Sequence, residues 1–168
     1  MNYEQVLANA TKILKSASIK SSKLDCEVLL SNVLKINREK MLVNLNKKIN
    51  HQDFINFNKL INRRVKNEPV AYIVGYKEFW NKKFKVNSDV LIPRPDTEIL
   101  VEEVIKLIKI NSSLNILDIG TGTGCVILSV LNERKKCYGI GLDISKKAIN
   151  IAKHNAKIQQ IKNRIKFI

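Results

Sequence analysis

The chain has 168 residues, 45% of them hydrophobic, and its 30 Lys and Arg outnumber its 15 Asp and Glu, which gives a formal net charge of +15. This composition is typical of a folded globular protein and excludes a membrane span, because no apolar run reaches the required length. The start MNYEQVLANATKILK lacks the apolar core of a secretory signal, so we expect a cytoplasmic protein.

The positive charge by itself favours anionic partners such as RNA or acidic proteins. The excess is lysine spread over every segment, however, which indicates compositional drift, and no interleaved aromatic and arginine residues offer a base-stacking surface. We therefore expect no direct binding to nucleic acid. Cys26, Cys125 and Cys137 are scattered, which indicates reduced thiols. His51 and His154 lack ligand-like neighbours, so no metal site is expected.

Residues 1–68 carry apolar residues at helical spacing, which predicts a small N-terminal helical domain. Ser21-Ser22 and Asn50 are suitable start signals for its second and third long helices, and residues 41–45 are expected to form a short extra turn. The apolar stripes, which we assign to the core, are Val6, Ala10, Ile13 and Leu14, then Val28, Leu29, Val33 and Leu34, then Phe54, Phe57, Leu60 and Ile61.

From Val70 the pattern changes to β-branched and aromatic residues broken by Gly75 and Asn81, which predicts a β-hairpin linker over residues 69–93. Phe79 and Trp80 are adjacent, so in a strand they face opposite sides. We expect one of them in the core and the other over a pocket.

The segment VLIPRPDTEILVE, residues 90–102, has the signals of a helix start. Asp96 is expected to cap the free amides, and Glu98 places negative charge at the positive end of the helix dipole. Arg94 has no part in that account. Because its two flanking prolines restrict it, Arg94 is a candidate wall of a site, with surface pairing to Glu98 or Glu102 as the alternative.

Residues 94–168 alternate helix and strand, with short apolar strands at Leu114–Gly120 and Cys137–Ser145 and a third opening at RIKFI. Such alternation predicts a parallel sheet with right-handed crossovers. The predicted fold class is therefore α/β, the first half of a Rossmann-like domain that follows the helical domain and the hairpin.

The stretch LDIGTGTGCVIL is the most informative. A buried strand ends at Asp118, and Gly120, Gly122 and Gly124 form a loop into the next helix, where open amides can hold an anionic group. Asp143 ends the next strand about twenty residues further on, where a carboxylate can accept hydrogen bonds from both hydroxyls of a ribose. Together these features predict a nucleoside-cofactor site.

The spacing of the glycines distinguishes between cofactors. A dinucleotide fingerprint needs Gly or Ala at the sixth position counted from Gly120, where this chain has Cys125. S-adenosylmethionine has no pyrophosphate, and its ammonium and carboxylate suit an acid at a strand end beside open amides. We therefore predict S-adenosylmethionine over NAD, and over a glycine turn without a ligand.

The segments GYKEFWNKKFKVNSDVLIPRPDTEILVE, ILDIGTGTG and GLDIS resemble the peptide-chain release factor glutamine methyltransferase family (PrmC/HemK), and the resemblance covers essentially the whole chain. It implies a class I S-adenosylmethionine methyltransferase domain over residues 94–168 and release-factor binding by the helical domain. It also implies methylation of the side-chain amide nitrogen of the glutamine in the GGQ loop of peptide-chain release factors.

The resemblance also implies roles for particular residues. It implies contact of the glycine loop and of Asp143 with S-adenosylmethionine, and the position of Asp118 at a strand end adds this acid to the set. The predicted cofactor-binding residues are thus Asp118, Gly120, Thr121, Gly122, Thr123, Gly124 and Asp143. The residues expected to shape the substrate pocket are Arg94, Thr97, Glu98 and Phe79. No catalytic acid or base is expected, because the transfer depends on positioning.

The family's substrate motif, Asn-Pro-Pro-Tyr, is absent, since the prolines of the chain are Pro69, Pro93 and Pro95 alone. In the family this motif holds the weakly nucleophilic amide in line with the methyl group. We therefore predict a fragment of an active enzyme. The alternatives are a non-catalytic release-factor-binding form and a nucleic-acid (adenine or RNA) methyltransferase relative, and the IPRPDTE segment argues against the second.

Overall fold

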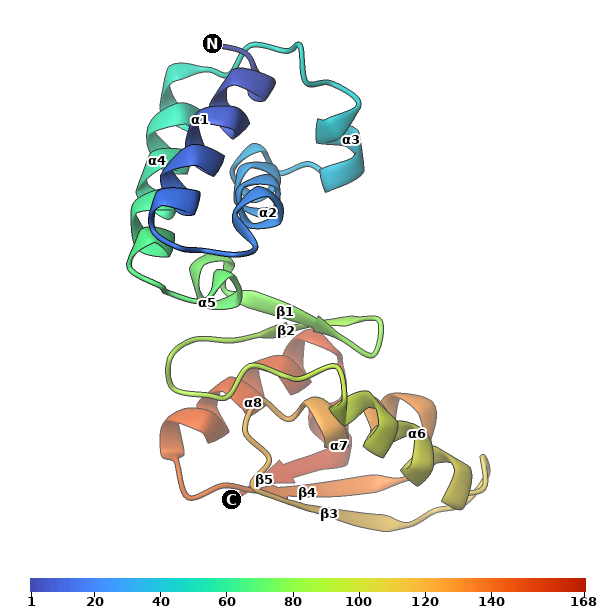
Figure 1. Cartoon of the computed structure of the whole chain (residues 1–168). Coiled ribbons are helices and arrows are strands. Elements are labelled where there is room, and N and C mark those ends of the chain that lie inside the picture. Colours follow the sequence, from blue (N-terminus) through green and yellow to red (C-terminus); the bar gives the residue numbers. More distant parts are fainter. The chain divides into compact units, whose positions relative to one another are not determined.

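A computed structural model describes residues 1–168, and the chain divides into two compact units, Met1–Val74 and Gly75–Ile168 (Figure 1). Each unit has its own apolar core. None of the helices is both long and apolar enough to span a membrane.

The first unit is a small helical bundle, which confirms the N-terminal helical region of the predicted fold class; the unit ends at Val74 rather than at residue 68. Helices α1 and α4 lie side by side and both pack on α2 (Figure 1). Five fully buried side chains fill its centre: Leu14, Leu29, Leu30, Met41 and Phe57. Its helices are α1 (Tyr3–Ser16), α2 (Ser22–Leu34), α3 (Arg38–Leu42), α4 (His51–Val65) and α5 (Val70–Val74).

The predicted helix starts are found in this unit. Asn50 precedes α4, and its side-chain oxygen accepts the N–H of Asp53 at 2.8 Å. Helix α2 begins at Ser22, but Ser21 makes no capping bond, because its hydroxyl donates to the Asp25 carboxylate at 2.8 Å. The short extra turn predicted at residues 41–45 overlaps the end of helix α3, which begins three residues earlier, at Arg38.

The prediction of strand from Val70 onward is wrong over its first five residues, which form α5. Pro69 explains the difference, because its ring fixes a helical φ and its carbonyl accepts the N–H groups of Tyr72 and Ile73. A short apolar run cannot be assigned to helix or strand by its pattern alone. Gly75, with φ of +83°, then ends the helix.

The β-hairpin itself is confirmed and belongs to the second unit, so the predicted linker is divided between the two units. Strands β1 (Tyr76–Phe79) and β2 (Lys82–Lys85) pair antiparallel. Trp80 and Asn81 form the turn with φ of +49° and +55°, the combination that a two-residue turn with the twist of the strands requires.

The rest of the second unit has the predicted alternation of helix and strand. Its sheet is parallel, with the order β3-β4-β5, which confirms the predicted α/β class and the beginning of a Rossmann-like domain. The elements are α6 (Thr97–Leu107), β3 (Asn115–Ile119), α7 (Cys125–Glu133), β4 (Tyr138–Leu142), α8 (Lys146–Ile158), a 3₁₀ turn (Lys162–Arg164) and β5 (Ile165–Phe167).

The two faces of this sheet differ. The helices of the unit lie on one side of it (Figure 1), and there Ile127, Leu128, Leu131, Ala152 and Phe167 form the core. The other side, which we name the bare face, carries apolar side chains in contact with solvent. Its members are Leu117, Ile119, Tyr138 and Ile140, which are 56%, 77%, 52% and 38% exposed.

Candidate cofactor-binding site

The site lies at the carboxyl ends of β3 and β4. These strands are parallel and in register, with Ile119 opposite Leu142, so the segments that follow them start side by side. The glycine loop, residues 120–124, follows β3, and Asp143 follows β4. Sequence analysis predicted that the two would meet, and the N–H of Gly122 donates to Asp143 Oδ2 at 2.8 Å.

The three loop glycines all have positive φ, +76° at Gly120, +54° at Gly122 and +77° at Gly124. A Cβ at Gly120 would meet nothing within 4 Å, so the loop is open to an approaching group there. A Cβ at Gly124 would lie 3.1 Å from the Leu128 side chain. Gly120 therefore leaves room for a ligand, whereas Gly124 allows the loop to pack on α7.

Most loop amides already have acceptors. The N–H groups of Gly120 and Thr121 both donate to the Leu142 carbonyl, at 2.9 and 2.8 Å, and that of Gly124 donates to the Thr121 carbonyl at 2.7 Å. Gly122 donates to Asp143, which leaves the N–H of Thr123 without an acceptor. Thr123 is buried, and a buried amide without a partner is a donor suited to a ligand.

The two predicted acids have different surroundings. Asp118 Oδ2 accepts the Thr121 hydroxyl at 2.7 Å, so this carboxylate holds the loop. Asp143 Oδ1 accepts the N–H of Ser145 at 2.9 Å, and Oδ2 accepts that of Gly122. Each carboxylate oxygen can accept two hydrogen bonds and here accepts one, so Asp143 keeps acceptor capacity for ribose hydroxyls.

A hollow of about 500 Å³ opens beside these groups, lined by Ile119, Gly120, Leu142, Asp143, Ile144 and Ile168. Small-molecule sites typically measure about 300–1,000 Å³. Apolar walls, a carboxylate and an open glycine fit a nucleoside. The residues present therefore fit S-adenosylmethionine.

Cys125 follows the glycine loop as the first residue of α7. Burial raises the pKa of the Cys125 thiol, so the thiolate is scarce at neutral pH. Burial also raises the pKa of Cys26, in the first unit, to about 11. All three cysteines are free, and no group of three or more His, Cys, Asp or Glu residues is placed to hold a metal ion.

Known proteins match both units. Residues 5–75 match the family described as PrmC N-terminal domain, and residues 110–168 match a Methyltransferase domain family. A "Release factor glutamine methyltransferase" from Buchnera aphidicola is 44% identical over 156 residues, 89% of this chain and 56% of the relative. The predicted resemblance to the release factor glutamine methyltransferase family is confirmed.

Other relatives agree with this assignment. A "Release factor glutamine methyltransferase" from Coxiella burnetii is 39% identical over 97% of this chain and 58% of its own length. A "Bifunctional methyltransferase" from Rickettsia conorii is 37% identical over 98% of this chain and 36% of its own. The chain thus spans about half or less of the length of these curated relatives. The methyltransferase-domain match also confirms S-adenosylmethionine over NAD as the cofactor of this domain.

A solved SAM-dependent methyltransferase from Geobacter sulfurreducens, in complex with S-adenosyl-L-homocysteine, covers 45% of this chain and 28% of its own. Its TM-score is 0.38 at 21% identity. The fold assignment therefore rests on the strand order of this chain and on the domain match.

The residues expected at the substrate pocket have separate positions in the second unit. Arg94 is exposed, and neither predicted surface partner pairs with it. Glu98 accepts the N–H of Trp80 at 2.9 Å, and Glu102 pairs with Lys106 at 3.0 Å. Arg94 is therefore free to contact a ligand, and its role stays a prediction.

Thr97 begins α6, and its N–H donates to the Arg94 carbonyl at 3.1 Å. The prediction that Asp96 caps this helix through its side chain is wrong. Asp96 has helical φ and ψ of −60° and −23° and makes no capping bond, whereas a side-chain cap needs extended geometry. Phe79 is 2% exposed and packs edge-on against Phe84, so it offers almost no surface to a substrate.

Proposed function

We propose that this chain provides the cofactor-binding and docking parts of a protein-(glutamine-N5) methyltransferase. Its substrate would be the glutamine of the GGQ loop in peptide-chain release factors. The observation that carries the proposal is the hydrogen bond from Gly122 to Asp143, which brings the glycine loop and the strand-end acid to one hollow. Relatives named release factor glutamine methyltransferase support the choice of substrate.

When bound, S-adenosylmethionine supplies a methyl group activated by its sulfonium. The residues of this chain would bind and orient it. Asp143 would accept the ribose hydroxyls, the N–H of Thr123 would donate to the amino-acid end, and the open backbone at Gly120 would allow close approach. This task is one of positioning, so no acid or base is assigned.

The glutamine amide must also be held, and no Asn-Pro-Pro-Tyr segment is present among these 168 residues. We propose that residues outside this chain hold the amide. The same observation favours one second candidate, a form that binds a release factor without methylating it. Methyl transfer to a purified release factor by this chain would exclude that second candidate.

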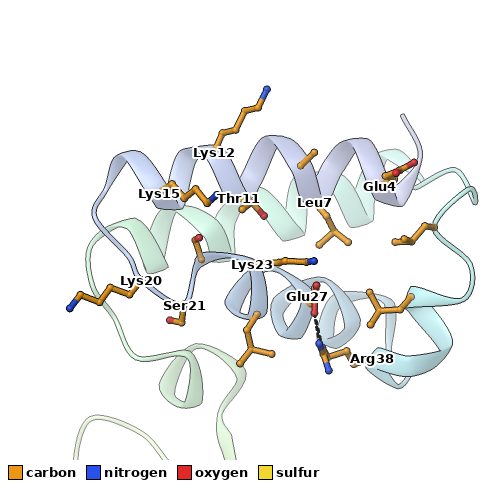
Figure 2. A pocket seen from close by; sticks show the side chains of 15 residues that line it. Glu4, Leu7, Thr11, Lys12, Lys15, Lys20, Ser21, Lys23, Glu27 and Arg38 are labelled. Atoms are coloured by element: carbon orange, nitrogen blue, oxygen red, sulfur yellow. Dashed lines mark hydrogen bonds and ion pairs between the residues drawn. The ribbon is translucent and has the colours of Figure 1, made fainter.

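For the first unit we propose release-factor docking. A hollow of about 980 Å³ lies between α1, α2 and α3. In Figure 2, Leu7 and Thr11 point into it from α1, and Glu27 of α2 pairs with Arg38 at 2.6 Å. Its cationic lining is Lys12, Lys15, Lys20, Lys23 and Arg38, and its apolar lining is Leu7, Ala8, Leu24, Leu42 and Leu45.

This lining suits one kind of partner. The lysines have no acidic partners in the structure, so they are available to carboxylates, and the leucines can bury apolar side chains. The lining carries no aromatic ring on which a base could stack, which argues against RNA. We therefore propose that an acidic segment of the release factor, with apolar side chains, binds in this hollow.

Asp143→Ala tests the cofactor assignment. Loss of its charged hydrogen bonds should weaken S-adenosylmethionine binding by about 1–3 kcal/mol. Isothermal titration of the whole chain would measure this loss. Glu103→Ala, at an exposed position of α6, is the control with the same change in charge, and it should bind as the unaltered chain does. Equal affinities for both variants would refute the ribose assignment.

Lys15→Glu with Lys23→Glu tests the docking assignment. A purified release factor should bind this double variant at least tenfold more weakly at low salt, because two attractive charges become repulsive. The control is Lys48→Glu with Lys59→Glu, an equal charge change outside the hollow. Biolayer interferometry would measure both. An equal loss in the two variants would show a general charge effect and reject the hollow as the docking site.

A further inference from the structure

Asn155 lies on α8, and its side chain is fully buried. Its Oδ1 accepts the N–H of Lys85 at 2.7 Å. Its Nδ2 donates to the carbonyl of Lys85 at 3.2 Å and to the carbonyl of Thr123 at 2.9 Å. Both protons of the side-chain amide are therefore in use, a degree of satisfaction expected of a buried polar group.

The two bonds to Lys85 act as a neighbouring strand would. Lys85 is opposite Tyr76 in the hairpin, and the next residue, Val86, donates its N–H to the Gly75 carbonyl. Bonded and non-bonded positions alternate along an antiparallel pair, so the backbone groups of Lys85 point away from β1. Asn155 satisfies both of these groups on the free edge of β2.

The third bond connects this hairpin to the glycine loop. The carbonyl that accepts it belongs to Thr123, the residue whose N–H is the loop amide without an acceptor. A Cβ at the neighbouring loop residue, Gly124, would lie 3.1 Å from the Leu128 side chain and 3.5 Å from that of Ala152, so this end of the loop lies close to α7 and α8. One side chain of α8 therefore holds the backbone of the loop beside the donor that a ligand would use.

We propose that Asn155 is a positioning residue of the cofactor site, which fixes the Thr123 backbone against the edge of β2. This inference rests on the proposed cofactor site for its effect on binding. The position of the loop can be measured without any ligand, so the two can fail separately.

The first test is amide hydrogen exchange of the whole chain. In Asn155→Leu an apolar side chain fills the buried site but makes none of the three hydrogen bonds. Residues 120–124 should then exchange at least tenfold faster than in the unaltered chain. In Asn155→Asp the carboxylate can still accept from Lys85 but cannot donate to Thr123, so the loop should again exchange faster. Unchanged exchange of the loop in a folded Asn155 variant would overturn the inference.

The matched control is Ile149→Ala, a truncation of a buried core residue on the same helix that makes none of these bonds. It should lower the thermal midpoint of the chain without a selective rise in loop exchange. A selective rise of the same size in Ile149→Ala would mean that the loop responds to any loss of stability, and would overturn the positioning role.

The second test is affinity. At a temperature where all variants are folded, both Asn155 variants should bind S-adenosyl-L-homocysteine at least fivefold more weakly, and Ile149→Ala within twofold of the unaltered chain. If the unaltered chain binds and the Asn155 variants bind equally well, the inference fails while the cofactor site stands. If the unaltered chain does not bind, the proposed function fails, and loop exchange alone decides the role of Asn155.

The unaltered chain provides the decisive measurement if neither Asn155 variant folds. Saturating S-adenosyl-L-homocysteine should slow the exchange of residues 82–86 together with that of the loop, because Asn155 joins the two. Protection of the loop alone would overturn the inference.

Discussion

Gly141 of β4 lies against the aromatic ring of Phe167 on β5. A Cβ at this position would be 2.6 Å from the ring and 3.0 Å from the Thr121 hydroxyl. A separation below 3.0 Å from an enclosed ring cannot be relieved without moving it, since Phe167 is 8% exposed. The absence of a side chain at Gly141 therefore lets β5 and the cofactor loop approach β4.

Gly141→Ala should destabilise the second unit by about 1–3 kcal/mol, the usual cost of an overpacked core. Urea unfolding followed by the fluorescence of Trp80, the only tryptophan, reports on this unit. The cost should be smaller when Gly141→Ala is made in a Phe167→Leu background, where the ring is gone. An equal cost in both backgrounds would mean that the ring is not the obstacle.

Single residues were predictable from the sequence where their type and spacing allow few structural roles. The glycines of the loop and Asp143 follow from spacing, and the structure brings them together. The contact of Gly141 depends on where β5 packs, which no local pattern reveals. Asn155 was also missed, although an asparagine among the apolar residues of α8 is a signal of a buried polar contact.

The capping of helices gives a test at the scale of elements. Asn50→Ala should destabilise the first unit by about 1 kcal/mol, because Asn50 accepts the N–H of Asp53. Asp96→Ala should change the stability of the second unit by less than about 0.5 kcal/mol, because Asp96 makes no capping bond. Chemical denaturation followed by circular dichroism and by Trp80 fluorescence would measure both. A larger cost for Asp96→Ala would restore the predicted cap.

Elements with a clear period were predictable, and short apolar runs were not. The alternation after residue 94 gives the strands and helices of the sheet because each is long enough to show its pattern. The five residues of α5 are too few to show a helical period. The flanking residues Pro69 and Gly75 determine that this segment is helical. The role of Asp96 could not be predicted for a related reason. A capping side chain requires an extended backbone at that residue, and the residue type alone does not determine the backbone conformation.

The bare face of the sheet is the feature of the chain that most affects its stability and its tendency to associate. The sheet belongs to the predicted first half of a Rossmann-like domain and has an uncovered apolar face, whereas parallel sheets normally bury both sides. The structure shows which side is uncovered, since all the helices of the unit lie on the other (Figure 1). Both outer strands, β3 and β5, also have an unpaired edge.

The chain should therefore associate with itself as its concentration rises. Leu117 and Ile140 are opposite each other in the register and are 56% and 38% exposed on the bare face. Replacing them together, Leu117→Glu with Ile140→Lys, places opposite charges across the strands and should reduce association while the unit stays folded. Light scattering after size-exclusion chromatography, over a concentration series, would measure this change.

The control for this experiment is Val43→Lys, which removes an apolar side chain that is 84% exposed in the first unit. It should leave association unchanged, because a single exposed apolar residue is common on protein surfaces and the contiguous bare face is not. A chain that stays monomeric at every concentration and unfolds in one sharp transition would show that the exposed sheet neither drives association nor weakens the unit. Association lost equally in the control would place the contact in the first unit instead.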